Sequence, residues 1–434
     1  MRLTKSFWLS TAVACAIQAT TAHAGSLADI YNQAVSQDPQ LKAAQANSQA
    51  GQEILPQTRA ELLPEVNLSA RTSWNESSIQ NDFNNHGYTV SLSQPVFSAP
   101  AWYGFKRGQA LSEGAALQYD QAQQDLIQRT VEDYLTVLRA INNLETSQAE
   151  ERAVQRRLDQ VNAQFEVGLI AITDVQEAQA TYDNTKVERI LAEGDLDNSY
   201  EALDRLTGQT YSSIDLLSEE YPIENPTPLE SAPWLEKANA GNLGLKIADV
   251  NVEAARRQAQ FSRSGHLPEV FLTASYDESN GSATTIDSTD RSTIALRLTV
   301  PLYAGGAISS ETREDEYRYT EAQQVREDTF RALTQNTRSL LRDLRTDVLS
   351  VAARKQSIKS SQTALKATEE GFSVGTRNVV DVLDAERKLY TAQRDYATAR
   401  FDYVQNLIDF KQQIGTLGPQ DLLGLDQWMT AQEY

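Results

Sequence analysis

Residues that bind metals or form disulfides are rare in this sequence of 434 residues, which has one cysteine and three histidines. So small a set leaves little room for a disulfide framework, a thiol nucleophile or a zinc site, and neither His86 nor His266 has a second ligand at a useful spacing. Positive charge is also in deficit, because 59 Asp and Glu outnumber 39 Lys and Arg and leave a net charge of −20. We therefore expect no metal centre, no cofactor and no nucleic-acid partner, since nucleic-acid binding requires clustered Lys and Arg.

Motifs of common enzymes are missing as well. The sequence has no GxxxxGK[ST] segment that could cradle a nucleotide and no GxSxG segment that could present a nucleophilic serine. We expect that the protein is not an enzyme.

The first 24 residues are typical of an export signal. Arg2 and Lys5 precede the apolar stretch FWLSTAVACAIQA, and AHA at 22–24 is a small-x-small cleavage site, so we predict removal of residues 1–24. The alternatives are a buried N-terminal helix and lipid attachment at Cys15, which lacks the leucine usual before a lipidated cysteine. No later stretch reaches the ~18 apolar residues that a membrane-spanning helix needs. The sequence thus predicts an exported protein that is either soluble or an outer-membrane β-barrel.

Two copies of one sequence pattern make up the chain. LPEV occurs at residues 63–66 and again, 204 positions later, at 267–270. FEVGLIAITDVQEA at 165–178 likewise corresponds to FSVGTRNVVDVLDA at 372–385, an offset of 207. Landmarks at a nearly constant offset predict a tandem repeat. The predicted divisions are the signal segment 1–24, repeat one at 25–220, a Pro-rich linker at 221–233, repeat two at 234–418 and a C-terminal segment at 419–434.

Each copy contains long stretches that favour helices. Residues 101–221 and 302–418 contain no proline, and helix-forming residues dominate both. Apolar residues recur at spacings of three and four, as at Val131 and Tyr134, which is typical of a coiled-coil seam. The pattern predicts one helix over residues 99–165, about 100 Å long at ~1.5 Å per residue.

Short runs of alternating polarity lie between the helical stretches. EVNLSARTSW and YTVSLSQPVF in copy one, and EVFLTASY and STIALRLTV in copy two, each place apolar side chains on one face. Each run has the length of a tilted membrane-spanning strand. We predict one hairpin per copy, at about 65–97 and 269–303, with polar loops at 75–87 and 277–291. Four aromatic residues could lie at the membrane interfaces or pack in a soluble sheet: Trp74, Tyr88, Tyr276 and Tyr303.

Four strands leave two open edges, which lipid does not tolerate. Membrane barrels begin at eight strands, so one chain cannot close a barrel alone. Either several chains share one barrel, or the four strands form a water-soluble sheet. The residues alone do not choose between these arrangements or between two and three chains.

At 165–178 and 372–385 the sequence resembles the TolC-type outer-membrane efflux proteins. GHLPEVFLTAS at 265–275 and QQIGTLGPQDLLGL at 412–425 also resemble this family, and the resemblance runs from about residue 25 to 425. It implies a fold dominated by α-helices with some β-structure, in which a long α-helical coiled-coil tunnel in the periplasm joins a β-barrel shared by three protomers and embedded in outer-membrane lipid. It also implies a passive exit duct of tripartite efflux pumps and type I secretion in a Gram-negative bacterium. The implied partners are a periplasmic adaptor protein and an inner-membrane transporter of the RND, ABC or MFS type.

The resemblance places the entrance constriction of the tunnel at Asp381 and Asp384. The two aspartates are three residues apart on a predicted helix and share a face. Three copies around an axis would form two rings of carboxylates, which select cations and could bind a blocking multivalent cation. The alternative is an ordinary solvated acidic helix face.

The resemblance also implies a latch that holds the tunnel closed. It assigns Arg377 to donate to Thr173 and Asp174 across the two repeats, as a charge-assisted pair. The family's tyrosine partner of that aspartate falls at Phe372, which has no hydroxyl, so we expect a closed state that opens more easily.

Gly168 and Gly375 follow the pattern Phe-x-Val and allow the sharp reversal of a helical hairpin. The resemblance marks both turns as the surface that contacts the adaptor. A plain hairpin without a partner would use the same glycines. A different function class, a trimeric surface adhesin or structural coiled-coil protein, shares the export signal and the heptads but would not embed a strand hairpin in each half.

Overall fold

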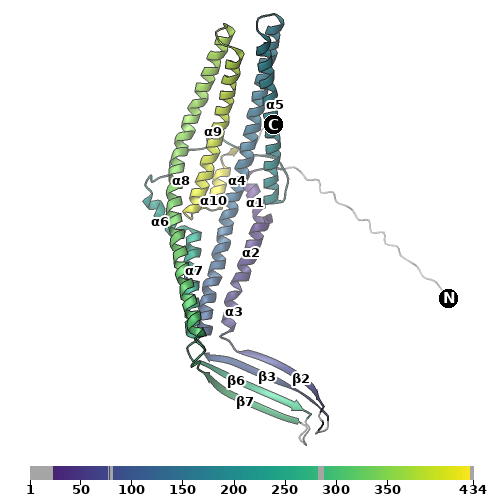
Figure 1. Ribbon diagram of the computed structural model, residues 1–434, viewed down its shortest axis with the longest axis vertical. Helices are drawn as coiled ribbons and strands as arrows, with labels where there is room; N and C mark the ends of the chain where they lie inside the picture. Colours follow the sequence, from purple (N-terminus) through teal and green to yellow (C-terminus); the bar gives the residue numbers. More distant parts are fainter. Residues whose placement is uncertain (1–22, 77, 79–81, 282–287, 431–434) are drawn as a thin grey trace, which may run out of the picture.

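The computed structural model of the protein describes residues 23–76, 78, 82–281 and 288–430. These residues form an elongated molecule in which long helices run side by side and a four-stranded sheet continues from one end at an angle (Figure 1). The predicted export signal lies outside the described residues except for His23 and Ala24, so Cys15 and its predicted lipidation lie outside them too. Among the described helices, none is both long and apolar enough to cross a membrane.

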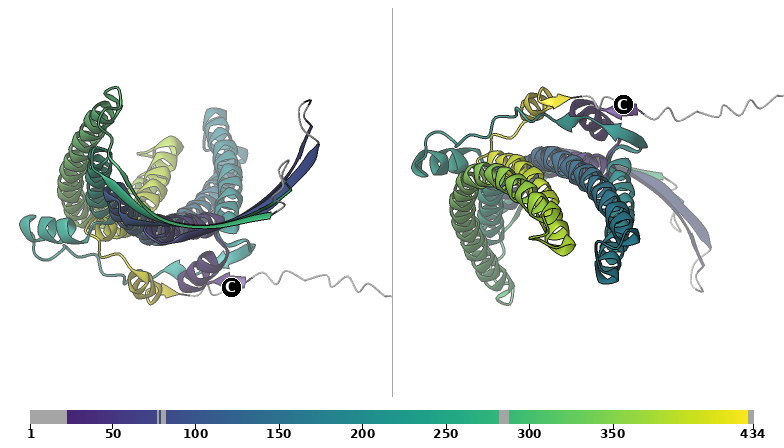
Figure 2. Two further views of the ribbon diagram at one scale, coloured as in Figure 1. Left: turned by 90° about the horizontal axis from the view of Figure 1, so that it is seen from below. Right: turned by 90° about the horizontal axis from the view of Figure 1, so that it is seen from above.

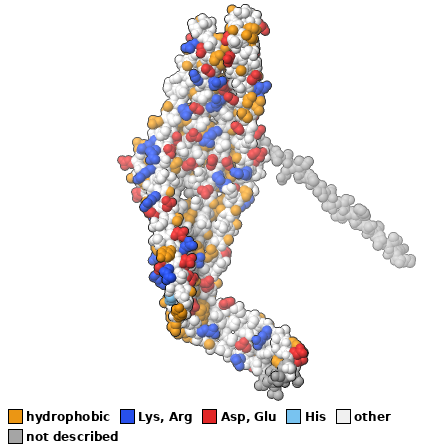
Figure 3. All heavy atoms as spheres, viewed as in Figure 1, with side chains coloured by type: hydrophobic (Ala, Val, Ile, Leu, Met, Phe, Trp, Pro, Cys, Tyr) orange, Lys and Arg blue, Asp and Glu red, His pale blue; other side chains and the backbone are white. Residues whose placement is uncertain are grey.

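Four long helices make up most of the molecule: α4 (Ala99–Glu166), α5 (Ile172–Thr207), α8 (Ala307–Ser373) and α9 (Val379–Gln413). The predominantly helical fold is therefore confirmed, and α4 ends one residue beyond the helix predicted at 99–165. Ser98 fixes its start, because the serine hydroxyl accepts the Ala101 N–H at 3.2 Å. The four helices pack in the order α5–α4–α9–α8 as one curved layer (Figure 2). Charged side chains of both signs are scattered over the face of the layer that Figure 3 shows.

Shorter helices flank the halves of α4 and α8 that lie nearer the sheet. α2 (Pro39–Gln52) and α3 (Ile54–Ala60) pack against α4, and α7 (Leu243–Ser264) packs between α4 and α8. The buried Asp38 begins α2, where its carboxylate accepts the Leu41 N–H and pairs with Arg129 of α4 at 2.7 Å. The curved layer thus continues along the whole length of α4 and α8.

One antiparallel sheet contains the four strands that the alternating polarity predicted: β2 (Glu65–Asn75), β3 (Phe83–Phe97), β6 (Glu269–Asn280) and β7 (Ser288–Thr299). Their order is β2–β3–β6–β7, so β3 and β6 join the two halves of the sheet. Apolar side chains such as Leu68 in β2 and Ile294 in β7 are exposed. Among the described strands, β2 and β7 each leave one edge unpaired.

A belt of short elements lies at mid-height on the convex side of the helical layer (Figure 2). Arg400 of α9 donates to the Ser218 carbonyl, and the Tyr403 hydroxyl donates to the Glu224 carbonyl at 2.8 Å, so the belt is tied to α9. The belt consists of α1 (Leu27–Gln37), α6 (Ala232–Gly241), α10 (Pro419–Asp426), the parallel pair β1 (His23–Gly25) and β4 (Tyr211–Ile214), and the antiparallel pair β5 (Leu216–Leu217) and β8 (Met429–Thr430).

The main apolar core lies where the belt meets the long helices. Leu27 and Ile30 of α1 pack there with Leu135 of α4, and all three are fully buried. Tyr134 of α4 is also buried, and its hydroxyl donates to the Asp215 carbonyl at 2.7 Å. Burial raises the pKa of Tyr134, so its hydroxyl stays a donor. This core holds the centre of the molecule, whereas the helix tips extend well beyond it.

Candidate functional site at the helix tips

Both pairs of long helices reverse direction at the end farthest from the sheet (Figure 1). Gly168 between α4 and α5 has a φ of 75°, and Gly375 between α8 and α9 has a φ of 79°, a left-handed conformation that favours glycine. The Leu169 N–H donates to the Gln164 carbonyl at 2.9 Å, and the second tip has the equivalent bond. These are bonds of the Schellman motif, which satisfies the last carbonyls of a helix. The glycines therefore form sharp turns, and their contact with an adaptor stays a prediction.

Large apolar side chains are exposed beside these turns. Val167 and Leu169 are 70% and 73% exposed at the first tip, and Val374 is 73% exposed at the second. A single exposed apolar residue is ordinary, but several gathered on the two tips form an apolar surface. The tips can therefore bury apolar area against a partner.

Asp381 has a structural role at the start of α9. Its backbone N–H donates to the Asn378 side chain at 2.8 Å, and its carboxylate accepts the Asn378 N–H at 3.3 Å, which together form a capping box. Asp384 follows less than one helical turn later and is exposed. The two carboxylates thus lie on adjacent positions of one helix face, as their spacing predicted.

Arg377 lies just before α9, with its guanidinium 3.8 Å from the Asp381 carboxylate. Among the described residues, no hydrogen bond or ion pair joins Arg377 to Thr173 or Asp174. Asp174 lies in the first turn of α5, on the neighbouring helical hairpin. The described chain therefore does not make the latch contact by itself, and the latch stays a prediction.

Phe372, which replaces the family's tyrosine in the predicted latch, packs against an apolar cluster near the tips. The cluster joins both helical hairpins, since it includes Val161 of α4 and Leu383 of α9. The phenyl ring thus contributes apolar contact in place of the hydrogen bond that tyrosine would make.

Arg157 forms an ion-pair cluster that the sequence did not reveal. Its guanidinium extends from α4 to Glu369 of α8 at 2.7 Å and to Glu386 of α9 at 2.9 Å. The Arg157 and Glu386 side chains are only 11% and 7% exposed. The two glutamates lie more than 200 residues from the arginine in sequence, so no local motif could have found them. This cluster ties the first helical hairpin to the second.

Two further polar contacts connect α4 to α9. Arg394 donates to the buried Glu150 at 3.2 Å, and Gln128 donates to Asp409 at 2.9 Å. Burial raises the pKa of both carboxyl groups, and the donors lower it in part. The interface between the two hairpins is therefore bridged by polar side chains at several heights.

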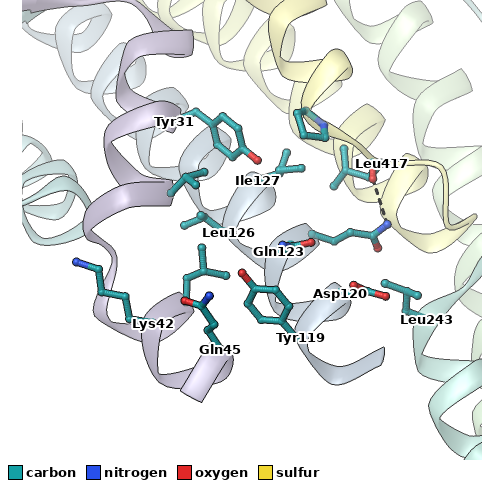
Figure 4. A pocket seen from close by; sticks show the side chains of 14 residues that line it. Tyr31, Lys42, Gln45, Tyr119, Asp120, Gln123, Leu126, Ile127, Leu243 and Leu417 are labelled. Atoms are coloured by element: carbon teal, nitrogen blue, oxygen red, sulfur yellow. Dashed lines mark hydrogen bonds between the residues drawn. The ribbon is translucent and has the colours of Figure 1, made fainter. Parts of the chain in front are cut away.

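A groove of about 550 Å³ lies at mid-height between α1, α2 and α4 (Figure 4). Tyr31, Lys42 and Tyr119 line it, and the Gln124 amide donates to the Leu417 carbonyl at its edge at 3.1 Å. No group of three or more His, Cys, Asp or Glu in the described part of the chain could hold a metal ion. The arrangement of the groove indicates no chemistry beyond packing and hydrogen bonding.

Comparison with known proteins gives a consistent result. The family model described as "Outer membrane efflux protein" matches residues 30–209 and 234–416. The chain is 37% identical over 411 residues to the outer membrane protein TolC of Vibrio cholerae serotype O1, with 93% of each chain covered. It is 27% identical to the proteases secretion protein PrtF of Dickeya chrysanthemi, covering 96% of this chain and 94% of that one.

Solved structures share the fold. The channel CusC superposes with a TM-score of 0.80 at 16% identity, covering 91% of this chain and 93% of that one. VceC of Vibrio cholerae superposes with a TM-score of 0.79 at 17% identity, covering 90% of this chain and 96% of that one. The long helices and the four-stranded sheet therefore have the arrangement seen in these outer-membrane proteins.

Proposed function

The chain belongs to the outer membrane efflux protein family, and from this premise we infer how it works. It is an outer-membrane efflux and secretion channel of a Gram-negative bacterium, and it extends into the periplasm. The adhesin alternative is wrong, because the family match covers both halves of the chain. The assembly, gate and partners of the channel are proposed below.

We propose that three copies of the chain close one duct. The observation that supports this most is that, in the described part of the chain, both the sheet and the helical layer at the tips end in two open edges. β2 and β7 have unpaired edges, and the helical layer ends at α5 on one side and α8 on the other. Three chains with four strands each would form a twelve-stranded barrel in outer-membrane lipid, as in the resemblance noted above. The helices would then enclose a tunnel in the periplasm.

We propose that the entrance of the tunnel lies at the helix tips. Asp381 and Asp384 would form two rings of three carboxylates that favour cations. Arg377 of one protomer would donate to Thr173 and Asp174 of its neighbour and hold the tips together. Opening would move α8 and α9 away from α4 and α5, which also requires the Arg157 cluster to separate.

We propose that a periplasmic adaptor binds the apolar surface at the turns of Gly168 and Gly375. The exposed Val167, Leu169 and Val374 support this, since they have no partner within the described chain that covers them. An inner-membrane transporter of the RND, ABC or MFS type would supply the energy. The duct itself would be passive and would need no cofactor.

The domain division at 25–220, 221–233 and 234–418 also stays a proposal, with 419–434 as a C-terminal segment. Two separate matches of one family model, at 30–209 and 234–416, support a tandem duplication. Cleavage after residue 24 would fall inside β1 (His23–Gly25) and leave Gly25 as the N-terminus.

Native mass spectrometry of the protein extracted from outer membranes tests the proposed assembly. We expect a complex with three times the mass of one processed chain. A single chain would contradict a shared barrel, because four strands cannot close one. A dimer would contradict the three-chain duct, because its barrel would have eight strands and not twelve.

A further inference from the structure

The groove between α1, α2 and α4 has no part in the proposed duct (Figure 4). α1 belongs to the belt on the convex side of the helical layer and lines the groove through Tyr31, so the groove opens outside the tunnel that the helices would enclose (Figure 2). Its volume of about 550 Å³ lies in the range of small-ligand sites, ~300–1,000 Å³. A stable protein partner would instead bury roughly 1,200 Å² or more. The size of the groove therefore favours a ligand of a few rings over a folded partner.

The floor of the groove is apolar. Leu41, Leu126 and Ile127 line it, and each is at most 6% exposed. Figure 4 shows Leu126 between the rings of Tyr31 and Tyr119. Both rings pack against the apolar cluster that contains Leu41 and Leu126, so their positions are fixed before any ligand binds. C–H groups of a ligand can pack on this floor and stack on the two rings.

Free polar groups surround this floor. In the described part of the chain, the hydroxyls of Tyr31 and Tyr119 and the amides of Gln45 and Gln123 line the groove and make no hydrogen bond. Burial raises the pKa of Tyr31, so its hydroxyl stays protonated and can donate. Each amide offers two donors and one acceptor oxygen. A ligand in the groove thus meets four unengaged polar side chains from three helices.

The charges at the rim of the groove cancel. Among the described residues that line it, Lys42 of α2 and Asp120 of α4 are the charged ones. The Lys42 ammonium already donates to the Gln37 side chain at 3.3 Å. Phosphate-bearing ligands are bound by clustered cations, and here one lysine is offset by one carboxylate. The groove therefore suits a ligand without net charge, and neither a nucleotide nor a phospholipid headgroup.

An oligosaccharide of N-acetylated amino sugars combines these properties. The faces of a pyranose ring carry C–H groups that stack on tyrosine rings, and its edge carries hydroxyls that pair with amides and phenols. The acetamido group adds a methyl for the apolar floor and an amide that can pair with Gln45 or Gln123. The whole unit is uncharged, as the rim requires.

We propose that this groove binds such an oligosaccharide, and that the glycan strands of the cell wall supply it in the periplasm. Packing comes from Tyr31, Tyr119 and the leucine floor, and hydrogen bonds come from Gln45 and Gln123. The inference goes beyond the proposed duct and needs only that the channel extends into the periplasm. It gives the channel a tether to the cell wall.

Binding of a soluble sugar tests the site. The probe is the tetramer of N-acetylglucosamine, and the matched control is cellotetraose, which has the same backbone without acetamido groups. The processed channel is purified in an amine oxide detergent, because detergents with sugar headgroups would compete. Saturation-transfer NMR is expected to show contact with the acetyl methyl protons of the tetramer. Titration should give about fivefold or weaker binding of cellotetraose, which lacks the acetamido contacts.

Two variants locate the binding. Tyr119→Ala removes a ring, and Gln45→Ala with Gln123→Ala removes two exposed amides without touching the floor. Each is expected to weaken binding of the tetramer about fivefold or more. The control, Gln49→Ala with Gln118→Ala, removes two exposed amides of α2 and α4 that do not line the groove and should bind like wild type. No binding by wild type, or an equal loss in the control, would overturn the site.

Sedimentation with purified cell-wall sacculi tests the source of the sugar. Wild type is expected to sediment with the sacculi, and the Gln45→Ala, Gln123→Ala variant to stay largely in solution. Binding of the tetramer without sedimentation would overturn the cell wall as the source. Single-channel conductance of this variant should equal that of wild type. Lost sugar binding with normal conductance would leave the duct standing, whereas sugar binding without channel activity would count against the duct and not against the groove.

Discussion

Replacement of Arg157 by methionine is expected to loosen the tips more than any exposed substitution. The change removes the charge that joins α4 to Glu386 and Glu369 but keeps most of the apolar stem. The Glu386 side chain is 7% exposed, and its only described hydrogen bond comes from Arg157. Methionine therefore leaves a buried carboxylate without a partner.

The size of the effect follows from that carboxylate. Removing one partner of a buried ion pair costs about 3–5 kcal/mol. The exposed Glu369 adds at most about 1 kcal/mol. We expect a loss of about 3–4 kcal/mol per protomer.

Hydrogen exchange measures this loss locally. Amides in the first turns of α9 should exchange about 10²–10³ times faster in the variant at pH 7, once intrinsic exchange is corrected. Conductance through the purified channel should rise as well, because the closed arrangement loses an ion-pair contact between its two helical hairpins.

Two controls make the reasoning refutable. Arg331→Met removes an exposed i,i+4 pair with Glu327 and should change neither measurement. The Arg157→Met, Glu386→Met double variant removes both buried charges and should recover much of the loss. Unchanged exchange in Arg157→Met, or a double variant as loose as the single one, would show that this cluster does not hold the hairpins together.

Three further predictions concern single sites. Gly375→Ala should destabilise the second tip by about 1 kcal/mol because alanine disfavours positive φ, and faster exchange confined to that tip would show it. Asp381→Ala should fray the start of α9, because it removes the carboxylate of the Asn378 capping box and costs about 0.5–2 kcal/mol of helix stability. Asp381→Asn keeps a side-chain acceptor and should not fray the helix. Circular dichroism and hydrogen exchange compare the two variants. Burial raises the pKa of Asp409 in the folded state, so the folded chain binds more protons than the unfolded chain at pH values between the two pKa values of this group. The free energy of unfolding should therefore rise as the pH falls through that range. Thermal melting at several pH values should show this rise, and Asp409→Asn should flatten it.

Local patterns in the sequence predicted the local structure well. The absence of proline and the three-four spacing gave α4 to within a residue, and alternating polarity located the four strands. Gly168 and Gly375 could be predicted because a reversal between long helices needs a left-handed residue. These features depend on neighbours in sequence, which a single chain displays directly.

Contacts between distant helices could not be predicted. The Arg157 cluster joins three helices. The sequence contains many charged residues in its helices, and nothing next to Arg157 in the sequence shows that this arginine is the buried one. The latch residues Arg377, Thr173 and Asp174 were assigned from resemblance, and within one chain Arg377 lies beside Asp381 instead. The structural use of Asp381 in a capping box could have been read from Asn378 three residues before it.

Single-channel recording in a planar bilayer tests the central claim most directly. The processed protein is compared with the Asp381→Asn, Asp384→Asn variant, each with and without a trivalent cation. The proposed duct predicts a small cation-selective conductance that the trivalent cation blocks, with the block lost in the variant. No channel activity from the intact protein would contradict the duct, and unchanged selectivity and block in the variant would contradict an entrance formed by these two aspartates.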